Sequence, residues 1–415
     1  MATVKPFAGI RPNPAYAAQI AALPYDVMNR QEAKDMAKDN PYSFLHIDRA
    51  EIDLPDDIDP YSDIVYQTAK QKLNDMIKNG DFIQDTLPNY YIYRLTMDGR
   101  SQTGIVACTS IDEYLNGVIK KHELTRADKE TDRIRHVDTL NANTGPIFLA
   151  YRKNDTAKTI CNHWTDTISP VYNFVSDDGI QHTVWCIDDT KTINRLTESF
   201  AQVPYLYIAD GHHRNASAVK VGQKRRAEHP NASDTAEFNY YLSVLFPADE
   251  LHIFDYNRVV KDLHGYTEAD FLKTLETSFV VSLAPQSPFA PQKPHTFGMY
   301  LCGKWYCLEA KPSICSDDIV KGLDVSILQN TLLTPILGIQ DPRTDKRIDF
   351  VGGIRGLHAL QQRVDSGEMA VAFSMYPTSM QELMAVADAG LTMPPKSTWF
   401  EPKLRSGLFI HDLGK

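Results

Sequence analysis

The stretch Tyr205-Leu-Tyr-Ile-Ala-Asp-Gly-His-His-Arg214 decides how the middle of this chain folds. Its apolar first half predicts a strand over 204–209, which Asp210-Gly211 ends in a tight turn, and a helix is expected from about His212. Glycine in the turn lets a ligand approach the backbone closely. The first turn of a helix presents N–H groups without intrahelical partners and the positive end of the helix dipole, so this pattern favours a bound phosphate.

The side chains around this turn carry an unusual set of charges. His212, His213 and Arg214 place cations at the helix end where the dipole disfavours them, so we expect an anion that offsets the penalty. Arg214 would fork onto phosphate oxygens, and the imidazoles would donate hydrogen bonds. Asp210 is suited to hold Mg²⁺ or a substrate hydroxyl and is a candidate catalytic residue. The alternative is a helix capped by Asp210, with a surface pair of histidines.

The composition excludes several classes of protein. The 415 residues include 43 Lys and Arg against 53 Asp and Glu, a net charge of −10, which argues against a protein held on nucleic acid by bulk charge. No apolar run reaches the roughly 18 residues of a membrane span, and residues 1–12 lack the pattern of a signal peptide. The six cysteines are scattered without a Cys-x-x-Cys pair, which predicts plain thiols. We therefore expect a cytoplasmic protein with no nucleic-acid or membrane partner.

Periodic and alternating stretches predict a mixed α and β fold of the α+β class. We expect a β-rich first domain over 1–264 and an αβ domain over 265–415 packed against it. The turns at Asp98-Gly99 and Asp178-Gly179 are typical of hairpins. The expected elements are helices over 30–39, from Ser62 or Asp63 to Gly80, over 267–277 and over 326–337, hairpins over 90–108, 174–187 and 296–308, and a strand–helix–strand–helix run over 348–389.

The segment from Lys120 to His136 interleaves basic and acidic side chains. Phosphoryl transfer needs cations around the transferred group and a carboxylate near the nucleophile, which makes Glu123 a candidate base and Arg133 or Lys129 a candidate phosphate contact. The alternative is a solvated helix face with paired charges.

A third group of candidates lies in Met393-Pro-Pro-Lys-Ser-Thr-Trp-Phe-Glu-Pro-Lys403. Lys396, Ser397 and Thr398 offer hydrogen-bond donors to an anion. The alternative is a rigid loop whose only role is to pack its two aromatic residues on the core. Weaker candidates for lining a pocket are Arg11, Tyr25-Asp26 and Asn257-Arg258.

The strand–Asp-Gly-His-His-Arg–helix pattern resembles the phosphate motif of the ParB/sulfiredoxin superfamily, in the form found in archaeal free-serine kinases. The chain is also identified as a member of a bacterial family, domain of unknown function 1015, through stretches along nearly its whole length. His212 stands where sulfiredoxin has its reactive cysteine, and no basic helix-turn-helix of the ParB type is visible. The stretches that carry the resemblance include Phe7-Ala-Gly-Ile-Arg-Pro12, Pro24-Tyr-Asp-Val27, His122-Glu-Leu-Thr125, Asp349-Phe-Val-Gly-Gly353 and Met393–Phe400.

The resemblance implies a ParB/sulfiredoxin-like nucleotide-binding unit with insertions, followed by a C-terminal αβ unit. It also implies a phosphotransferase that phosphorylates the hydroxyl of free L-serine with ATP or ADP, or CTP, and Mg²⁺. In that reading Glu123 is the general base, Asp210 holds the metal, and the phosphates bind to Gly211, His212, His213, Arg214, Arg133 and Lys396. The alternative is a ParB-like nucleotide-binding switch that hydrolyses or senses a nucleotide and acts through a protein partner. For either function, a homodimer is one assembly that the chain could form.

Overall fold

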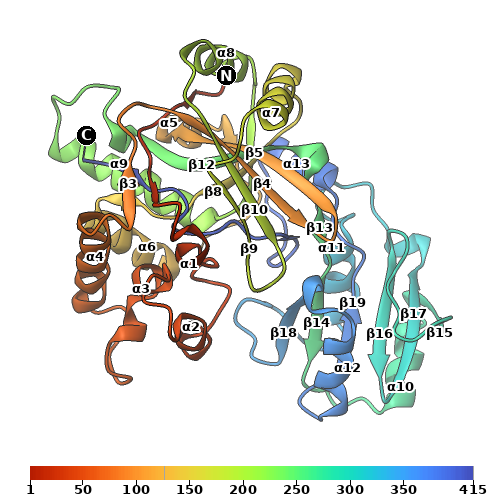
Figure 1. Ribbon diagram of the computed structural model, residues 1–415. Helices are drawn as coiled ribbons and strands as arrows, with labels where there is room; N and C mark the ends of the chain where they lie inside the picture. The colour runs from red at the N-terminus through yellow and green to blue at the C-terminus, as the bar shows by residue number, and fades with distance from the viewer. Residues whose placement is uncertain (126, 415) are drawn as a thin grey trace. The chain divides into compact units, whose positions relative to one another are not determined.

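The computed structural model describes residues 1–125 and 127–414 and has the mixed α and β fold that the sequence predicts (Figure 1). Two units separate in the pattern of contacts. The first contains residues 1–121, 125–251 and 402–415, and the second contains 122–124 and 252–401.

The first unit is built on a nine-stranded mixed sheet with the order β6-β11-β8-β12-β5-β4-β10-β9, and β1 pairs with β5 (Figure 1). Strand β11 runs parallel to β6 and antiparallel to β8, while β8 and β12 are parallel. The expected strand before Gly211 therefore lies inside a mixed sheet. The strands are β1 Val4–Lys5, β4 Tyr90–Met97, β5 Arg100–Ser110, β6 Ile119–Lys120, β8 Ile147–Tyr151, β9 Tyr172–Val175, β10 Gln181–Ile187, β11 Leu206–Asp210 and β12 Tyr240–Pro247.

Helices pack against this sheet through alternate strand residues. On one face, Ile147 and Leu149 of β8 share a core cluster with residues of three helices: α7 (Asp155–Thr167), α8 (Thr190–Phe200) and α9 (His212–Glu228). On the other face, Phe409 of the C-terminal segment contacts the rings of Tyr91 and Tyr93. The last residues of the chain are thus part of the first unit.

A smaller helical cluster completes the first unit. It contains α2 (Arg30–Ala37), α3 (Leu45–Asp48) and α4 (Asp63–Lys78), which share a second apolar core, and α6 (Ala127–Leu140) packs against both α4 and α9. The predicted helices at 30–39 and 63–80 are confirmed. Ser62 is the N-cap residue of α4, although its side chain makes no capping hydrogen bond.

The second unit is built on an antiparallel sheet with the order β15-β17-β16-β19-β14-β18. The predicted strand–helix–strand–helix run is confirmed as β18, α12, β19 and α13, but β14 lies between β18 and β19. The elements are β14 Tyr256–Val260, α10 Glu268–Leu275, β15 Phe279–Leu283, β16 Thr296–Leu301, β17 Lys304–Ala310, α11 Asp324–Leu328, β18 Ile348–Gly352, α12 His358–Asp365, β19 Val371–Ser374 and α13 Met380–Asp388.

Two details differ from the sequence-based expectation. The contact pattern changes at residues 251 and 252 instead of 264 and 265, because β14 pairs with β18 and β19 of the second unit. The helix expected over 326–337 ends early, because Gln329–Leu333 turns into a π-helix whose wider hydrogen bonds include Thr334 N to Gln329 O at 2.9 Å.

The predicted hairpin turns are present. Asp98 and Gly99 have φ of +50° and +77°, and Cys302 and Gly303 have +47° and +77°, the two left-handed residues that a tight hairpin turn requires. All six cysteines are free thiols, and Cys302 is exposed at its turn. None of the helices in the described residues combines the length and apolar character that a membrane crossing requires.

Candidate functional site

The junction between β11 and α9 forms as the sequence predicts. Gly211 is the N-cap residue of α9, with a left-handed φ of +87° that residues with a Cβ rarely adopt. Within the described residues, no side chain caps this helix. The alternative in which Asp210 is the N-cap is therefore wrong, and the start of α9 is the backbone arrangement that binds anions in other proteins.

Asp210 ends β11 and already has a cationic partner. Its Oδ1 accepts a hydrogen bond from the Gly211 backbone at 2.8 Å, and its Oδ2 accepts one from Lys403 Nζ at 2.8 Å. Desolvation acts to raise the pKa of Asp210, but the Lys403 ammonium and the hydrogen bond from the Gly211 backbone together act against it, and the pKa is lowered. The carboxylate is thus ionised, and a metal ion at Asp210 would have to share it with Lys403.

Arg214 faces a carboxylate of the protein itself. Its Nη2 donates to Asp48 Oδ2 at 2.8 Å and to Ser406 Oγ at 3.2 Å. A Cβ on Gly145 would lie 2.4 Å from Arg214 Nη1, so this path of the side chain requires glycine there. The anion expected to offset the charge of Arg214 is therefore Asp48, and in this structure the guanidinium is directed to it.

Asp48 is the buried centre of this arrangement. Its side chain has no solvent exposure, and Thr144 Oγ1 also donates to it at 3.2 Å. Burial alone would raise the pKa of Asp48, but the positive charges of Arg214 and Arg133 act against burial and hold the pKa well below its ordinary value. No local motif marks Asp48 in the sequence, which is why sequence reasoning missed it.

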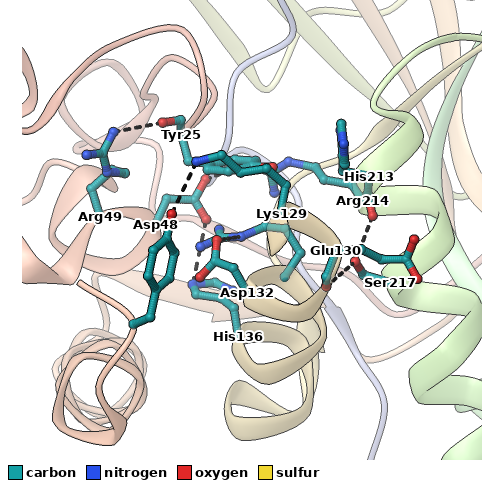
Figure 2. A network of polar contacts seen from close by, with 12 residues as sticks. Tyr25, Asp48, Arg49, Lys129, Glu130, Asp132, His136, His213, Arg214 and Ser217 are labelled. Carbon is teal, nitrogen blue, oxygen red and sulfur yellow. Dashed lines mark hydrogen bonds and ion pairs between the residues drawn. The ribbon is translucent and has the colours of Figure 1, made fainter. Parts of the chain in front are cut away.

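Helix α6 supplies the other members of the network (Figure 2). Asp132 accepts hydrogen bonds from Arg133 Nε and from the Tyr66 hydroxyl, both at 2.8 Å. The Arg133 guanidinium lies 4.0 Å from the centre of the Tyr25 ring. Burial and the neighbouring Arg133 lower the pKa of His136 to about 4, so this histidine is neutral at pH 7.

Several charged residues of α6 do not lie on the solvated helix face that was the alternative for this segment. Glu130, Asp132, Arg133 and His136 are all buried, with 3 to 7% of their surface exposed. Lys129 is the member that reaches outward, where its Nζ donates to the Tyr61 hydroxyl at 3.3 Å. Of the two phosphate contacts considered, the structure thus places Arg133 inside the network and Lys129 at its edge.

One donor of this network lacks a partner. Arg133 Nη1 is buried and has no hydrogen-bond partner in the described part of the chain. Next to it is a cavity of about 20 Å³, room for about one water molecule. The cavity is lined by Arg133, His136, Val137, Asn143, Thr144, Gly145, Ile147, Arg214, Ala218 and Leu242. The pocket behind the helix start is polar but too small, in this conformation, for a phosphate group.

Hydrogen bonds and an ion pair connect helices α6 and α9 next to His213 (Figure 2). Ser217 Oγ donates to the backbone oxygens of His213 at 2.7 Å and Glu130 at 3.2 Å, and Lys220 forms an ion pair with Glu130. His212 is buried, and His213 is half-buried. These contacts fix the first turns of α9 against α6.

The C-terminal segment supplies two contacts to the site. Arg405 is buried and donates to Asp178, to Ser176 Oγ at 3.0 Å and to His182 Nε2 at 3.2 Å. This anchoring holds the neighbouring Lys403 and Ser406, which contact Asp210 and Arg214 as described above. The sequence pattern indicated the stretch 393–403, with Lys396 as its site residue, and the structure adds the contacts of Lys403 and Ser406.

Glu123 and Lys396 belong to the second unit. There, Met393 N donates to the backbone oxygen of His122 at 2.8 Å, so the short segment with Glu123 adjoins the loop that carries Lys396. Lys396 has a left-handed φ of +59°, and its backbone oxygen accepts a hydrogen bond from Arg258 Nη2 at 3.0 Å. Of the predicted site residues, the structure thus gathers Asp210, Gly211, His212, His213, Arg214 and Arg133 in the first unit and Glu123 and Lys396 in the second.

The fold and the site define a mixed α/β protein built around a strand–glycine–helix junction with a buried ionic network behind it. The chain belongs to the family described as "Protein of unknown function (DUF1015)", which matches residues 4–326. This confirms the family membership that the sequence indicated.

The chain is also similar to several solved structures, at low sequence identity. A free serine kinase in complex with AMP is 14% identical, with 74% of this chain and 92% of that chain covered and a TM-score of 0.36. A conserved hypothetical protein from Pyrococcus furiosus is 15% identical, with 74% and 94% covered and a TM-score of 0.36. SbnI from Staphylococcus aureus, truncated at its C-terminus, is 10% identical, with 72% and 85% covered and a TM-score of 0.38. No curated protein matches the chain.

Proposed function

We propose that the protein is a nucleotide-dependent small-molecule kinase that phosphorylates the hydroxyl of free L-serine to O-phosphoserine. The observation that carries the proposal is the start of α9, where a left-handed Gly211 begins a helix that no described side chain caps. Such a helix start binds phosphate through backbone N–H groups. Buried Arg133, whose Nη1 has no hydrogen-bond partner among the described residues, adds a positive charge in the same unit.

Each predicted residue has a proposed role. The first turn of α9, from Gly211 to Arg214, binds the phosphates of ATP or ADP, and Arg133 and Lys396 add positive charge. Asp210 is the residue that would hold Mg²⁺, which in proteins often binds through one or two carboxylates together with substrate phosphates. When bound, the ion would neutralise charge on the transferred phosphoryl group.

The reaction we propose is a direct phosphoryl transfer. The serine hydroxyl oxygen bonds to the terminal phosphorus, the bond from that phosphorus to the nucleotide oxygen breaks, and the nucleotide leaves with one phosphate fewer. Glu123 is proposed to accept the hydroxyl proton. This role comes from the sequence resemblance and is tested by a variant below.

The test is to incubate the purified chain with L-serine, Mg²⁺ and ATP or ADP and to measure O-phosphoserine. Arg214→Met should abolish nucleotide use, whereas Arg226→Met is the matched control, because Arg226 lies later on the same helix and pairs with exposed Asp112. Glu123→Gln should lower turnover and leave nucleotide binding largely intact, since a base acts in the transition state. Nucleotide binding without phosphorylation of any hydroxylated amino acid would favour the nucleotide-binding switch instead.

A further inference from the structure

Arg258, on β14 of the second unit, is a buried cation without a counter-charge. Only 3% of its surface is exposed, and no carboxylate of the described residues forms an ion pair with it. Nη1 donates to the Tyr256 backbone oxygen and Nη2 to the Lys396 backbone oxygen. A guanidinium has five N–H donors, and these two hydrogen bonds are the ones that Arg258 forms within the described part of the chain.

The carboxylate nearest in sequence does not supply the missing charge. Asp255 Oδ2 accepts a hydrogen bond from the Asn257 side chain at 2.5 Å, and its backbone oxygen accepts one from Gly353 N at 2.8 Å. Burial lowers the pKa of Arg258 to about 10, with no carboxylate beside it to raise the value. Removing an unpaired charge from water costs free energy that two carbonyl contacts recover only in part.

The surroundings of Arg258 combine aromatic rings with a second cation. The guanidinium lies 5.5 Å from the centre of the Phe350 ring, which is directly opposite on β18. The ring centres of Tyr256 and Trp399 lie 5.0 Å apart, and Lys396 Nζ lies 5.5 Å from the centre of the Tyr256 ring. Tyr256 and Arg258 are two residues apart on one strand, so their side chains share one face of the sheet.

We propose that this face, formed by Arg258, Lys396, Tyr256, Phe350 and Trp399, binds the oxyanion of a small ligand. The oxyanion is a carboxylate or a phosphate group, and it supplies the negative charge that Arg258 lacks. A planar guanidinium is suited to both groups. The inference goes beyond the proposed phosphate site at Gly211, although Lys396 has a proposed role in both. The binding of an oxyanion by Arg258 does not depend on the kinase assignment.

The experiment measures oxyanion binding through Trp399, which lies in the proposed site. Tryptophan fluorescence of the full chain is titrated separately with inorganic phosphate, O-phospho-L-serine, L-serine and acetate, and the same titrations on Trp399→Phe isolate the local signal. We expect a saturable change that Trp399→Phe removes. A response to phosphate alone identifies a phosphate group, and a response to L-serine or acetate identifies a carboxylate.

Variants connect the signal to Arg258. Arg258→Met should raise the dissociation constant at least about tenfold, as expected for loss of a hydrogen bond to a charged group, and Arg258→Lys should lie between it and the wild type. The matched control is Arg347→Met, because Arg347 lies in the same unit and pairs with exposed Asp262. If Arg258→Met does not fold, Arg258→Lys and Lys396→Met carry the test, and both should weaken binding.

Two results would overturn the inference. One is the absence of a Trp399 response to every probe, and the other is binding by the Arg258 variants within twofold of the wild type. A purely structural arginine would lower the stability of the ligand-free protein and leave the oxyanion affinity unchanged. Binding at this face without formation of O-phosphoserine would refute the kinase proposal alone, so the two failures are distinguishable.

Discussion

Replacing Asp48 by asparagine tests the buried network behind the helix start. Asp48 has no exposed side-chain surface and Arg214 is 13% exposed, so the substitution leaves a largely buried guanidinium without its anion. Removing one partner of a buried ion pair costs about 3–5 kcal/mol. We therefore expect Asp48→Asn to lower the free energy of unfolding by about that amount, as measured by urea denaturation at pH 7.

The control for this variant is Asp112→Asn. Asp112 and its partner Arg226 are 55% and 37% exposed, so breaking that pair should cost less than about 1 kcal/mol. The double variant Asp48→Asn/Arg214→Met removes both buried charges and should be less destabilised than the sum of the two single variants, by about 0.5–3 kcal/mol. Strict additivity, or equal effects of Asp48→Asn and Asp112→Asn, would show that Asp48 and Arg214 do not stabilise the fold as a buried ion pair.

Acid should reduce the difference between Asp48→Asn and the wild type. The pKa of Asp48 is lowered in the folded protein, so its contribution to stability is present above the ordinary carboxyl pKa and is lost as the pH falls through the folded value. The same denaturation series at pH 3 should therefore show a smaller deficit than at pH 7.

Three further outcomes follow from the structure. Gly211→Ala should lower the free energy of unfolding by about 1–2 kcal/mol, because alanine is strained at a φ of +87°, and a nucleotide titration should show weaker binding; equal stability would contradict this. Lys403→Met should raise the pKa of Asp210, since desolvation is then unopposed by the ammonium, and an NMR titration of the carboxyl carbon that shows no change would count against the pair. In the folded protein the pKa values of His136 and His182 are about 4 and about 3, against an ordinary value of 6.5. Between these values and pH 6.5 the unfolded chain binds more protons than the folded protein, so the free energy of unfolding should rise with pH up to about 6.5. A free energy of unfolding from urea denaturation that does not change with pH would contradict this.

The elements that were predictable have local causes. The Asp98-Gly99 hairpin and the strand–Gly211–helix junction depend on backbone preferences of adjacent residues, which a sequence displays directly. The π-helix after α11 was not predictable, because the apolar pattern of 326–337 continues through it. The Gln329 side chain donates a hydrogen bond to the backbone oxygen of Ile339 at 2.9 Å, a contact that this pattern does not indicate.

The partners of the site residues could not be read from local sequence. Asp48 and Arg214 are 166 positions apart, and Lys403 and Asp210 are 193 apart, so only the folding of the whole first unit brings them together. The charged residues of α6 are also typical of a solvent-exposed helix face. The structure shows instead that the Tyr66 hydroxyl of α4 donates a hydrogen bond to Asp132, so this face of α6 is buried. The roles of Glu123 and Lys396 stay predictions from the sequence.

The most direct test of the account is a phosphotransfer assay at the start of α9. The purified chain is incubated with L-serine, Mg²⁺ and ATP or ADP, and O-phosphoserine is measured for the wild type, Arg214→Met and Arg226→Met. We expect O-phosphoserine from the wild type and Arg226→Met and none from Arg214→Met. No product from the wild type with either nucleotide, or equal product from Arg214→Met, would contradict it.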